Sequence, residues 1–288
     1  MIRSYLLDII DIFAKAEFEI TVHPTQRQGD AIITTRERSG EFDLVVCSGG
    51  DGTLDEVVSG MLQCEEHVPI GYIPAGSTND FAQSLRIPTN MLEAAATIVD
   101  GRLAECDMGK FNSNSFVYVA AFGMFTDVSY ETNQTLKNNI GHLAYILEGI
   151  KRLPQTKAYR MKVEYDDVVL DEEFLFGMVS NSESVGGFKG VTGPDVILND
   201  GLFEVTLVRN PVEITDYAEL MTSLVTGEED NKFFFNFKTS RIRFTSEEDV
   251  PWSLDGEYGG RPKIVELENM KRAIRIIVPA DEQLPCLI

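Results

Sequence analysis

The sequence is poor in several residue types, and each shortage excludes a class of protein. Its 288 residues include four cysteines, three histidines and one tryptophan. The cysteines, at positions 47, 64, 106 and 286, form no C-x-x-C pair, so the sequence predicts neither a disulfide framework nor a zinc site. A reduced cytoplasmic setting fits this cysteine usage best.

Basic residues and long apolar runs are also scarce. The 25 Lys and Arg residues against 46 Asp and Glu residues give a formal net charge of -21, which argues against a nucleic-acid-binding protein. The same charge disfavours long-range attraction to an anionic membrane, so any lipid contact needs a local basic or apolar patch. No signal peptide is visible, and no apolar run approaches the roughly 18 residues of a membrane-spanning helix.

The pattern of apolar residues changes near residue 105. Before this point helices alternate with short apolar strands, which predicts a parallel sheet with helices on both faces. These helices are expected at 5–16, 30–39 and 91–99, and the strands at 19–22, 45–47 and 69–73. After it, runs such as YRMKVEY, GLFEVTLV and SRIRF predict mostly antiparallel strands, with helices near 141–153 and 214–226. We therefore expect a domain boundary near residue 105.

The strongest motif is a glycine-rich turn, GGDGT at Gly49–Thr53, between an apolar strand and an amphipathic helix. Glycine permits backbone conformations that other residues avoid, and the first N–H groups of the helix point into the turn. Such a turn favours an anion, usually phosphate. Asp51 can hold Mg²⁺ directly or through water, and Thr53 can cap the helix and donate to phosphate. The alternative is that Asp51 and Thr53 only cap the helix.

A second turn, PAGSTNDFA at residues 74–82, also follows a strand. Neighbouring strand ends in an open parallel sheet face one crevice, so Asp51 and Asp80 are expected to share a metal ion. The alternative is that Asn79 or Asp80 simply caps the next helix.

Together, GGDGTLDEVVSG and PAGSTNDFA resemble the diacylglycerol kinase catalytic domain of soluble lipid kinases. That group includes sphingosine kinases and shares GGDGT with NAD kinases and phosphofructokinases. The resemblance covers nearly the whole chain. It implies a Rossmann-like or phosphofructokinase-like α/β domain over 1–105, joined by the tail 280–288. A C-terminal antiparallel β-sandwich over 106–279 would be the lipid-substrate domain.

The resemblance also implies ATP and Mg²⁺ as cofactors. Thr25 matches a family threonine that lines the nucleotide pocket. The implied nucleotide site comprises Thr25, Gly49, Gly50, Asp51, Gly52, Thr53, Leu54, Asp55, Glu56, Ser77, Asn79 and Asp80.

Two further motifs match the family. The resemblance implies that Glu257, in Asp255-Gly256-Glu257, accepts a proton from the attacking hydroxyl, with Asp255 a close competitor; without the resemblance a hairpin turn is the better interpretation. In PDVILNDGL at residues 194–202, it implies a structural Mg²⁺ held by the Asp200 carboxylate and main-chain carbonyls, although Asn-Asp-Gly is also a common turn. The carbonyls belong to Ile197 and Leu202, and Asp107 would join an ionic network between this loop and the active site.

The implied function is ATP- and Mg²⁺-dependent phosphorylation of diacylglycerol or a related lipid, giving phosphatidic acid or its analogue. The lipid would be met at the inner face of the membrane, and a homodimer is expected only by resemblance. The chain departs from the family in two respects. The first strand with its Asn-Pro-x-Ser/Ala-Gly turn is missing, because Met1 stands almost at the first helix, and Asp55 replaces the usual Asn.

Two alternatives remain open. An NAD kinase shares GGDGT, but PAGSTNDFA is the lipid-kinase form of the second turn. A catalytically silent nucleotide- or lipid-binding regulator is suggested by the missing strand, whereas retention of Asp51, Asp80 and both late carboxylates opposes it.

Overall fold

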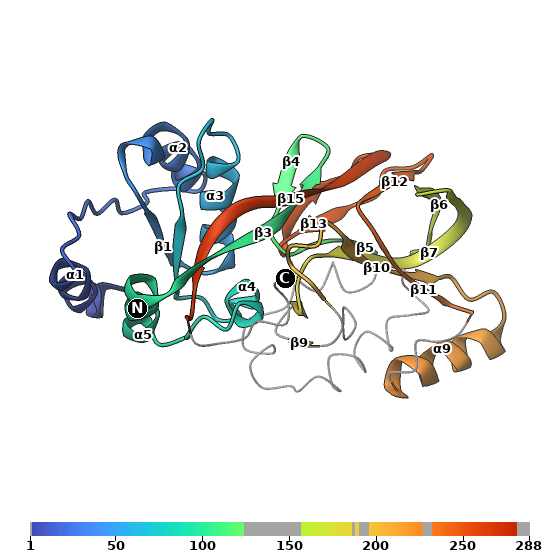
Figure 1. Cartoon of the computed structure of the whole chain (residues 1–288). Coiled ribbons are helices and arrows are strands. Elements are labelled where there is room, and N and C mark those ends of the chain that lie inside the picture. Colours follow the sequence, from blue (N-terminus) through green and yellow to red (C-terminus); the bar gives the residue numbers. More distant parts are fainter. Residues whose placement is uncertain (1, 124–156, 186–187, 190–195, 227–231, 281–288) are drawn as a thin grey trace. The chain divides into compact units, whose positions relative to one another are not determined.

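The computed structural model describes residues 2–123, 157–185, 188–189, 196–226 and 232–280 (Figure 1). The helix expected at 141–153 and nearly all of the tail expected to join the first domain lie outside these residues. The chain divides into two compact units, which are described separately. The first comprises Met1–Tyr118, Asn181–Leu202 and Asn269–Ile288, and the second comprises Val119–Ser180 and Phe203–Glu268.

The first unit combines a small parallel sheet with helices. Its elements are η1 (Ile2–Ser4), α1 (Leu6–Lys15), α2 (Asp30–Arg38), η2 (Ser39–Glu41), β1 (Val45–Gly49), α3 (Asp51–Met61), β2 (Ile70–Pro74), α4 (Asp80–Ser84), α5 (Met91–Asp100), β3 (Arg102–Phe111), β4 (Asn114–Phe116), β8 (Ser184–Val185), β9 (Phe188–Lys189) and the last part of β15 (Ile264–Val278). β1 pairs with β2 in parallel, from Val45 opposite Ile70 to Gly49 opposite Pro74. β15 continues this sheet in parallel, with Ile276 opposite Ile70.

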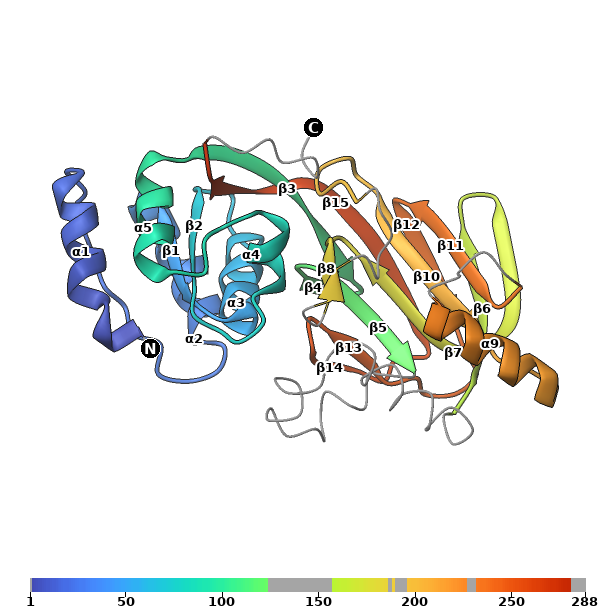
Figure 2. The ribbon, with the colours of Figure 1, turned by 90° about the horizontal axis from the view of Figure 1, so that it is seen from below.

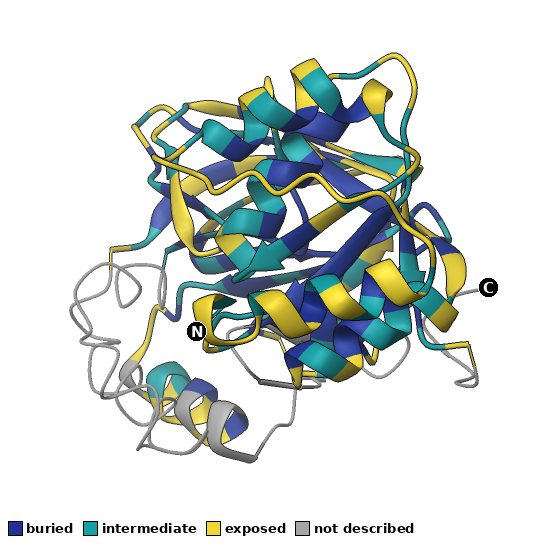
Figure 3. Ribbon diagram, turned by 90° about the vertical axis from the view of Figure 1, so that its left-hand side faces the viewer, coloured by how far each residue is buried: buried dark blue, intermediate teal, exposed yellow. Residues whose placement is uncertain are grey.

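The core of the first unit explains why these segments form. All five residues of β2 are buried, as expected of a parallel strand covered on both faces. α3 packs on β1 with α2 beside it, and α5 packs on β2 with α1 beside it. The helices carry buried residues on one side and exposed residues on the other (Figure 3). On α3 the buried side is formed by Leu54, Val57, Val58 and Met61, at helical spacing.

Two features of this unit differ from what the sequence predicts: the segment at 19–22 and the division of the chain. No strand forms over 19–22 within the described part of the chain, where residues 18–28 are exposed. Alternation of apolar residues predicts which side chains share a face, but a strand also needs a neighbouring backbone to pair with. The division of the chain is also less simple than a boundary near residue 105, because β3 and β4 stay with the first unit. β3 pairs with β15, a strand that reaches both units.

The second unit is an antiparallel β structure with one described helix. Its elements are β5 (Val119–Gly123), β6 (Tyr159–Tyr165), β7 (Val168–Ser180), β10 (Phe203–Arg209), α9 (Ile214–Thr226), β11 (Phe234–Thr239), β12 (Arg241–Thr245), β13 (Trp252–Leu254), β14 (Glu257–Gly260) and the start of β15. The strands follow the order β15-β12-β6-β7-β5-β13-β14, and β10 pairs with both β7 and β11 (Figure 2). The antiparallel pairing agrees with the sequence expectation, as does α9.

β7 is buried on both faces where it crosses the centre of this sheet. Successive residues of a strand point to opposite faces, and both Phe174 and Leu175 are buried. Leu175 packs with Leu220 of α9, Val208 and Phe233. A separate aromatic group contains Phe122, Tyr159, Phe244 and Trp252, with ring centroids 4.8 to 6.5 Å apart.

Candidate active site

The glycine turn leads from β1 into α3 with one residue between them. Gly50 is that residue, the N-cap of α3, and the N–H groups of Thr53 and Leu54 donate to its carbonyl at 3.0 and 3.1 Å. Thr53 is therefore the third residue of the helix, and the prediction that it caps α3 is wrong. Its side chain lies over Gly49 instead, where a Cβ would come within 2.5 Å of Thr53 Oγ1.

The open side of the turn is at Gly52. A Cβ built on Gly52 would meet nothing within 4 Å, and the residue is exposed. The first N–H groups of a helix have no acceptor within that helix, so the start of α3 is suited to an anion. Leu54 is 1% exposed, so its side chain belongs to the core.

The two turns predicted to meet do so within the first unit. Asp51 Oδ2 accepts the N–H of Asn79 at 2.8 Å, and the N–H of Ala75 donates to the Gly49 carbonyl at 2.8 Å. A Cβ on Gly76 would lie 2.7 Å from the Cα of Gly50. Glycine is needed at the second turn because the two backbones touch there.

Asn79 holds the second turn in shape. Its backbone has φ 53°, in the left-handed region that Asn tolerates better than most residues. Its Oδ1 accepts the N–H of Gly76 at 3.0 Å, and its Nδ2 donates to the Gly76 carbonyl at 3.0 Å. Asn79 is 5% exposed, so it is buried, and these hydrogen bonds hold the turn in place.

Tyr72 is a site residue that the sequence reasoning missed. The hydroxyl of this buried β2 residue lies 3.3 Å from the Gly49 carbonyl and 3.4 Å from Asn79 Oδ1, beneath both turns. Burial raises the pKa of Tyr72 most, and the charges of Asp51 and Asp80 raise it further. Both carboxylates therefore act on one hydroxyl. The sequence signal for Tyr72 is its hydroxyl, which is the single polar side-chain group in an apolar strand that leads into a turn.

Asp80 begins α4 and is 1% exposed, while Ser77 in the same turn is exposed. Ser84, also missed by the sequence reasoning, donates to the Asp80 carbonyl at 3.2 Å and lies 2.9 Å from Ser182 Oγ. These contacts fix α4, and with it Asp80, to the segment that follows β7.

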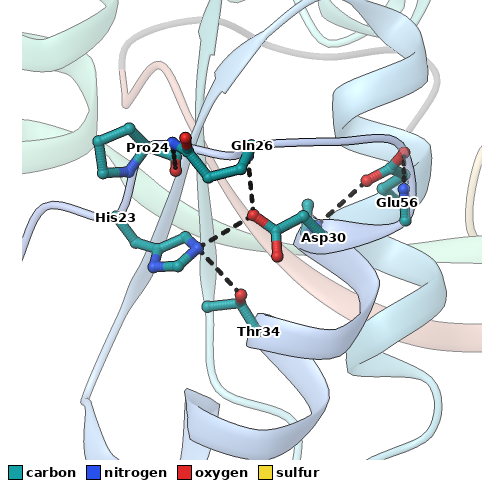
Figure 4. A network of polar contacts seen from close by, with 8 residues as sticks. His23, Pro24, Gln26, Asp30, Thr34 and Glu56 are labelled. Carbon is teal, nitrogen blue, oxygen red and sulfur yellow. Dashed lines mark hydrogen bonds and ion pairs between the residues drawn. The ribbon is translucent and has the colours of Figure 1, made fainter.

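The remaining predicted nucleotide residues are Thr25, Asp55 and Glu56. Glu56 accepts the N–H groups of Gly29 and Ala31 at 2.7 and 3.2 Å (Figure 4). Thr25 is exposed in the loop before α2, and Asp55 is partly buried on α3.

The late carboxylates belong to the second unit. Asp255 and Gly256 form the turn between β13 and β14, with φ 49° and 85°, so the hairpin interpretation holds in structural terms. Asp255 is 8% exposed; its Oδ1 accepts the Val119 N–H at 2.9 Å, and its own N–H donates to the Val119 carbonyl at 2.9 Å. Glu257 is exposed.

Asp107 organises the loop predicted to hold a structural metal. Its carboxylate accepts the N–H of Gly201 at 2.6 Å and of Arg272 at 2.7 Å, and Asp200 Oδ1 accepts the Leu202 N–H at 2.8 Å. Burial raises the pKa of the Asp107 carboxyl, against the two backbone N–H groups, which lower it. Within the described residues, no group of three or more His, Cys, Asp or Glu side chains surrounds one point. Pro194 and Asp195 lie outside the described residues.

Comparison with known proteins finds matches over nearly the whole chain. Residues 1–111 match the diacylglycerol kinase catalytic domain, and residues 118–278 match the YegS C-terminal NAD kinase beta sandwich-like domain. The diacylglycerol kinase of Bacillus subtilis (strain 168) is 33% identical over 283 residues, which cover 97% of this chain and 92% of the relative. The chain belongs to the diacylglycerol kinase family.

Further relatives of this kinase-family chain agree. The diacylglycerol kinase of Staphylococcus aureus (strain Newman) is 34% identical over 98% of the chain and 89% of the relative. A solved structure from Bacillus anthracis str. Sterne, assigned as a diacylglycerol kinase, has a TM-score of 0.81 at 26% identity and covers 96% of this chain and 92% of that one. The predicted family and the α/β plus β-sandwich fold are confirmed. No helix in the described part of the chain is long and apolar enough to cross a membrane.

Proposed function

We propose that this chain is an ATP- and Mg²⁺-dependent lipid kinase that transfers the γ-phosphoryl group to the hydroxyl of diacylglycerol or a related lipid. Membership of the diacylglycerol kinase family supports the reaction class. The observation that carries the proposal is the joined pair of turns, in which Asp51 accepts the Asn79 N–H at 2.8 Å beside the start of α4.

The residues at these turns suit Mg²⁺. Asp51 accepts the N–H of Asn79, the residue just before Asp80, so the two turns that carry these carboxylates meet. Mg²⁺ in phosphoryl-transfer sites is commonly held by one or two carboxylates together with substrate phosphates and water, so two carboxylates suffice. The ion would neutralise phosphate charge during transfer.

The chain's own groups would then position the nucleotide and the acceptor. The turn from Gly50 to Thr53 would bind the phosphates through backbone N–H groups, with Gly52 leaving room for them. Glu257 or Asp255 would accept the proton of the lipid hydroxyl. The exposure of Glu257 favours it, because the Asp255 carboxylate already accepts the N–H of Val119. The lipid would be met at a membrane surface.

A second Mg²⁺ is proposed for the loop at 197–202. Asp200 would supply a carboxylate oxygen, and Ile197 and Leu202 would supply carbonyl oxygens to a hydrated ion. Asp107 supports the loop shape through the Gly201 N–H. Few protein ligands are consistent with an ion that retains several waters.

The test is transfer of labelled phosphate from ATP to diacylglycerol in mixed micelles with Mg²⁺. Asp51→Asn should lower turnover by about 100-fold or more, since it removes a carboxylate charge beside the phosphates. The matched control is Asp43→Asn, the same change at an exposed residue before the other end of β1. Unchanged turnover in Asp51→Asn would refute the assignment. Phosphorylation of NAD but not of lipid would indicate an NAD kinase. Binding of an ATP analogue with no turnover would indicate a silent regulator.

A further inference from the structure

The N-terminus of α2 is capped by a carboxylate from another helix. Glu56, in the second turn of α3, accepts the N–H of Gly29 through Oε1 at 2.7 Å and the N–H of Ala31 through Oε2 at 3.2 Å (Figure 4). Gly29 is the N-cap residue of α2, with φ 79°, and has no side chain to cap the helix itself. Glu56 therefore supplies the missing cap from 27 residues further along the chain.

The loop before this cap is folded back on α2 by further polar contacts. Asp30 Oδ2 accepts the N–H of Gln26 at 2.9 Å and lies 3.4 Å from Nε2 of His23. The same His23 nitrogen lies 3.2 Å from Oγ1 of Thr34, one turn further along α2 (Figure 4). Residues 23–28, the part of the loop next to α2, are all exposed, so burial contributes little to holding it. The loop thus moves with the start of α2, which Glu56 fixes to α3.

Glu56 also connects this loop to α3, the helix that follows the glycine turn. It follows Thr53 by three residues on α3, which corresponds to about 5 Å along the helix axis at 1.5 Å per residue. A nucleotide with its phosphates at the glycine turn carries its ribose and base beyond that turn. The loop presents exposed polar and cationic side chains, from Thr25, Gln26, Arg27 and Gln28.

We propose that Glu56 is a positioning residue that holds the 23–29 loop against the ribose or base of the bound nucleotide, without touching the nucleotide itself. This inference rests on the proposed function. Each of the two Glu56 oxygens already accepts a backbone N–H, which is the geometry of a structural cap. The resemblance implies that Glu56 binds the nucleotide. Its hydrogen bonds go instead to the backbone at the end of the loop and the start of α2.

The test combines steady-state kinetics with amide hydrogen exchange on the full chain. Glu56→Ala should raise the KM for ATP about tenfold while kcat stays within about twofold, because a misplaced loop weakens binding and leaves the phosphoryl-transfer groups intact. Exchange at residues 23–31 should become faster. Glu56→Gln keeps one acceptor oxygen and should raise KM only about threefold.

The matched control is Arg36→Ala. Arg36 lies at the other end of α2 and donates to Gln63 Oε1 at 3.4 Å, so its loss loosens the contact of α2 with the segment after α3, away from the loop. It should alter neither the KM for ATP nor exchange at 23–31.

Three outcomes would overturn the inference. Weaker ATP binding without faster exchange would mean that Glu56 contacts the nucleotide directly. Faster exchange with an unchanged KM would mean that the loop is not part of the nucleotide site. If the unmodified chain neither binds an ATP analogue nor turns over, the proposed function fails and the positioning role fails with it; faster exchange in Glu56→Ala would then show only a structural cap.

Discussion

Single residues at the second turn combine an unusual backbone conformation with several hydrogen bonds. Asn79 has φ 53°. Its side-chain Oδ1 accepts the N–H of Gly76 and lies 3.4 Å from the Tyr72 hydroxyl. Asn79→Ala should lower the free energy of unfolding by about 2–3 kcal/mol, because it removes these contacts and leaves an alanine in the left-handed region. Asn79→Gly loses the same contacts without that strain and should cost about 1 kcal/mol less. Urea denaturation followed by circular dichroism measures both, and equal losses would show that backbone strain is not the constraint.

Some residues around the two turns could be predicted from the sequence and others could not. Asp51 and Asp80 could be selected because each follows an apolar strand at a turn. Tyr72 and Ser84 could not, since their hydroxyls matter only through the groups that folding brings to them. The resemblance implied that Glu56 binds the nucleotide, and the sequence could not show that its carboxylate accepts the N–H groups of Gly29 and Ala31 at the start of α2, 27 and 25 residues earlier.

At the scale of elements, the site depends on two strand–turn–helix units whose backbones touch. Gly76→Ala would place a Cβ 2.7 Å from the Gly50 Cα and 2.8 Å from Asn79 Oδ1, so the turns must separate. We expect a loss of about 2 kcal/mol or more in unfolding free energy, together with loss of nucleotide binding. The measurements are thermal unfolding and calorimetric titration with a non-hydrolysable ATP analogue.

Gly52→Ala is the informative comparison for this contact. The new methyl group meets nothing within 4 Å, and alanine favours the helix, so stability should stay level or rise by up to about 1 kcal/mol. Affinity for the ATP analogue should nevertheless fall, because the methyl group would occupy the space assigned to phosphate. Unchanged affinity in Gly52→Ala would place the phosphates elsewhere.

At the scale of the whole chain, the change from βα alternation to antiparallel strands was readable because periodicity is local. The division into units was not, because it depends on contacts between residues far apart in the sequence: the Asp107 N–H donates to the Leu198 carbonyl, and β15 pairs with β2 and β3. The segment at 19–22 shows the same limit, since its alternation predicts faces and cannot supply a neighbouring strand.

The stability of the folded chain at alkaline pH depends on a group in its core. Burial, and then the charge of Glu56, raises the pKa of Cys47 from 9.0 to about 12. Between these values the unfolded thiol has lost its proton and the folded thiol keeps it, so the unfolded state binds fewer protons and stability falls as pH rises. The contribution of Cys47 to this fall should be about 0.7 kcal/mol per pH unit at pH 9, about 1.2 kcal/mol per pH unit between pH 10 and 11, and close to zero below pH 8. Urea titrations from pH 7 to 11 should therefore show a shallower decline in Cys47→Ala, on top of a constant packing loss. Parallel declines in the two proteins would mean that the Cys47 thiol ionises as readily in the folded chain as in the unfolded one.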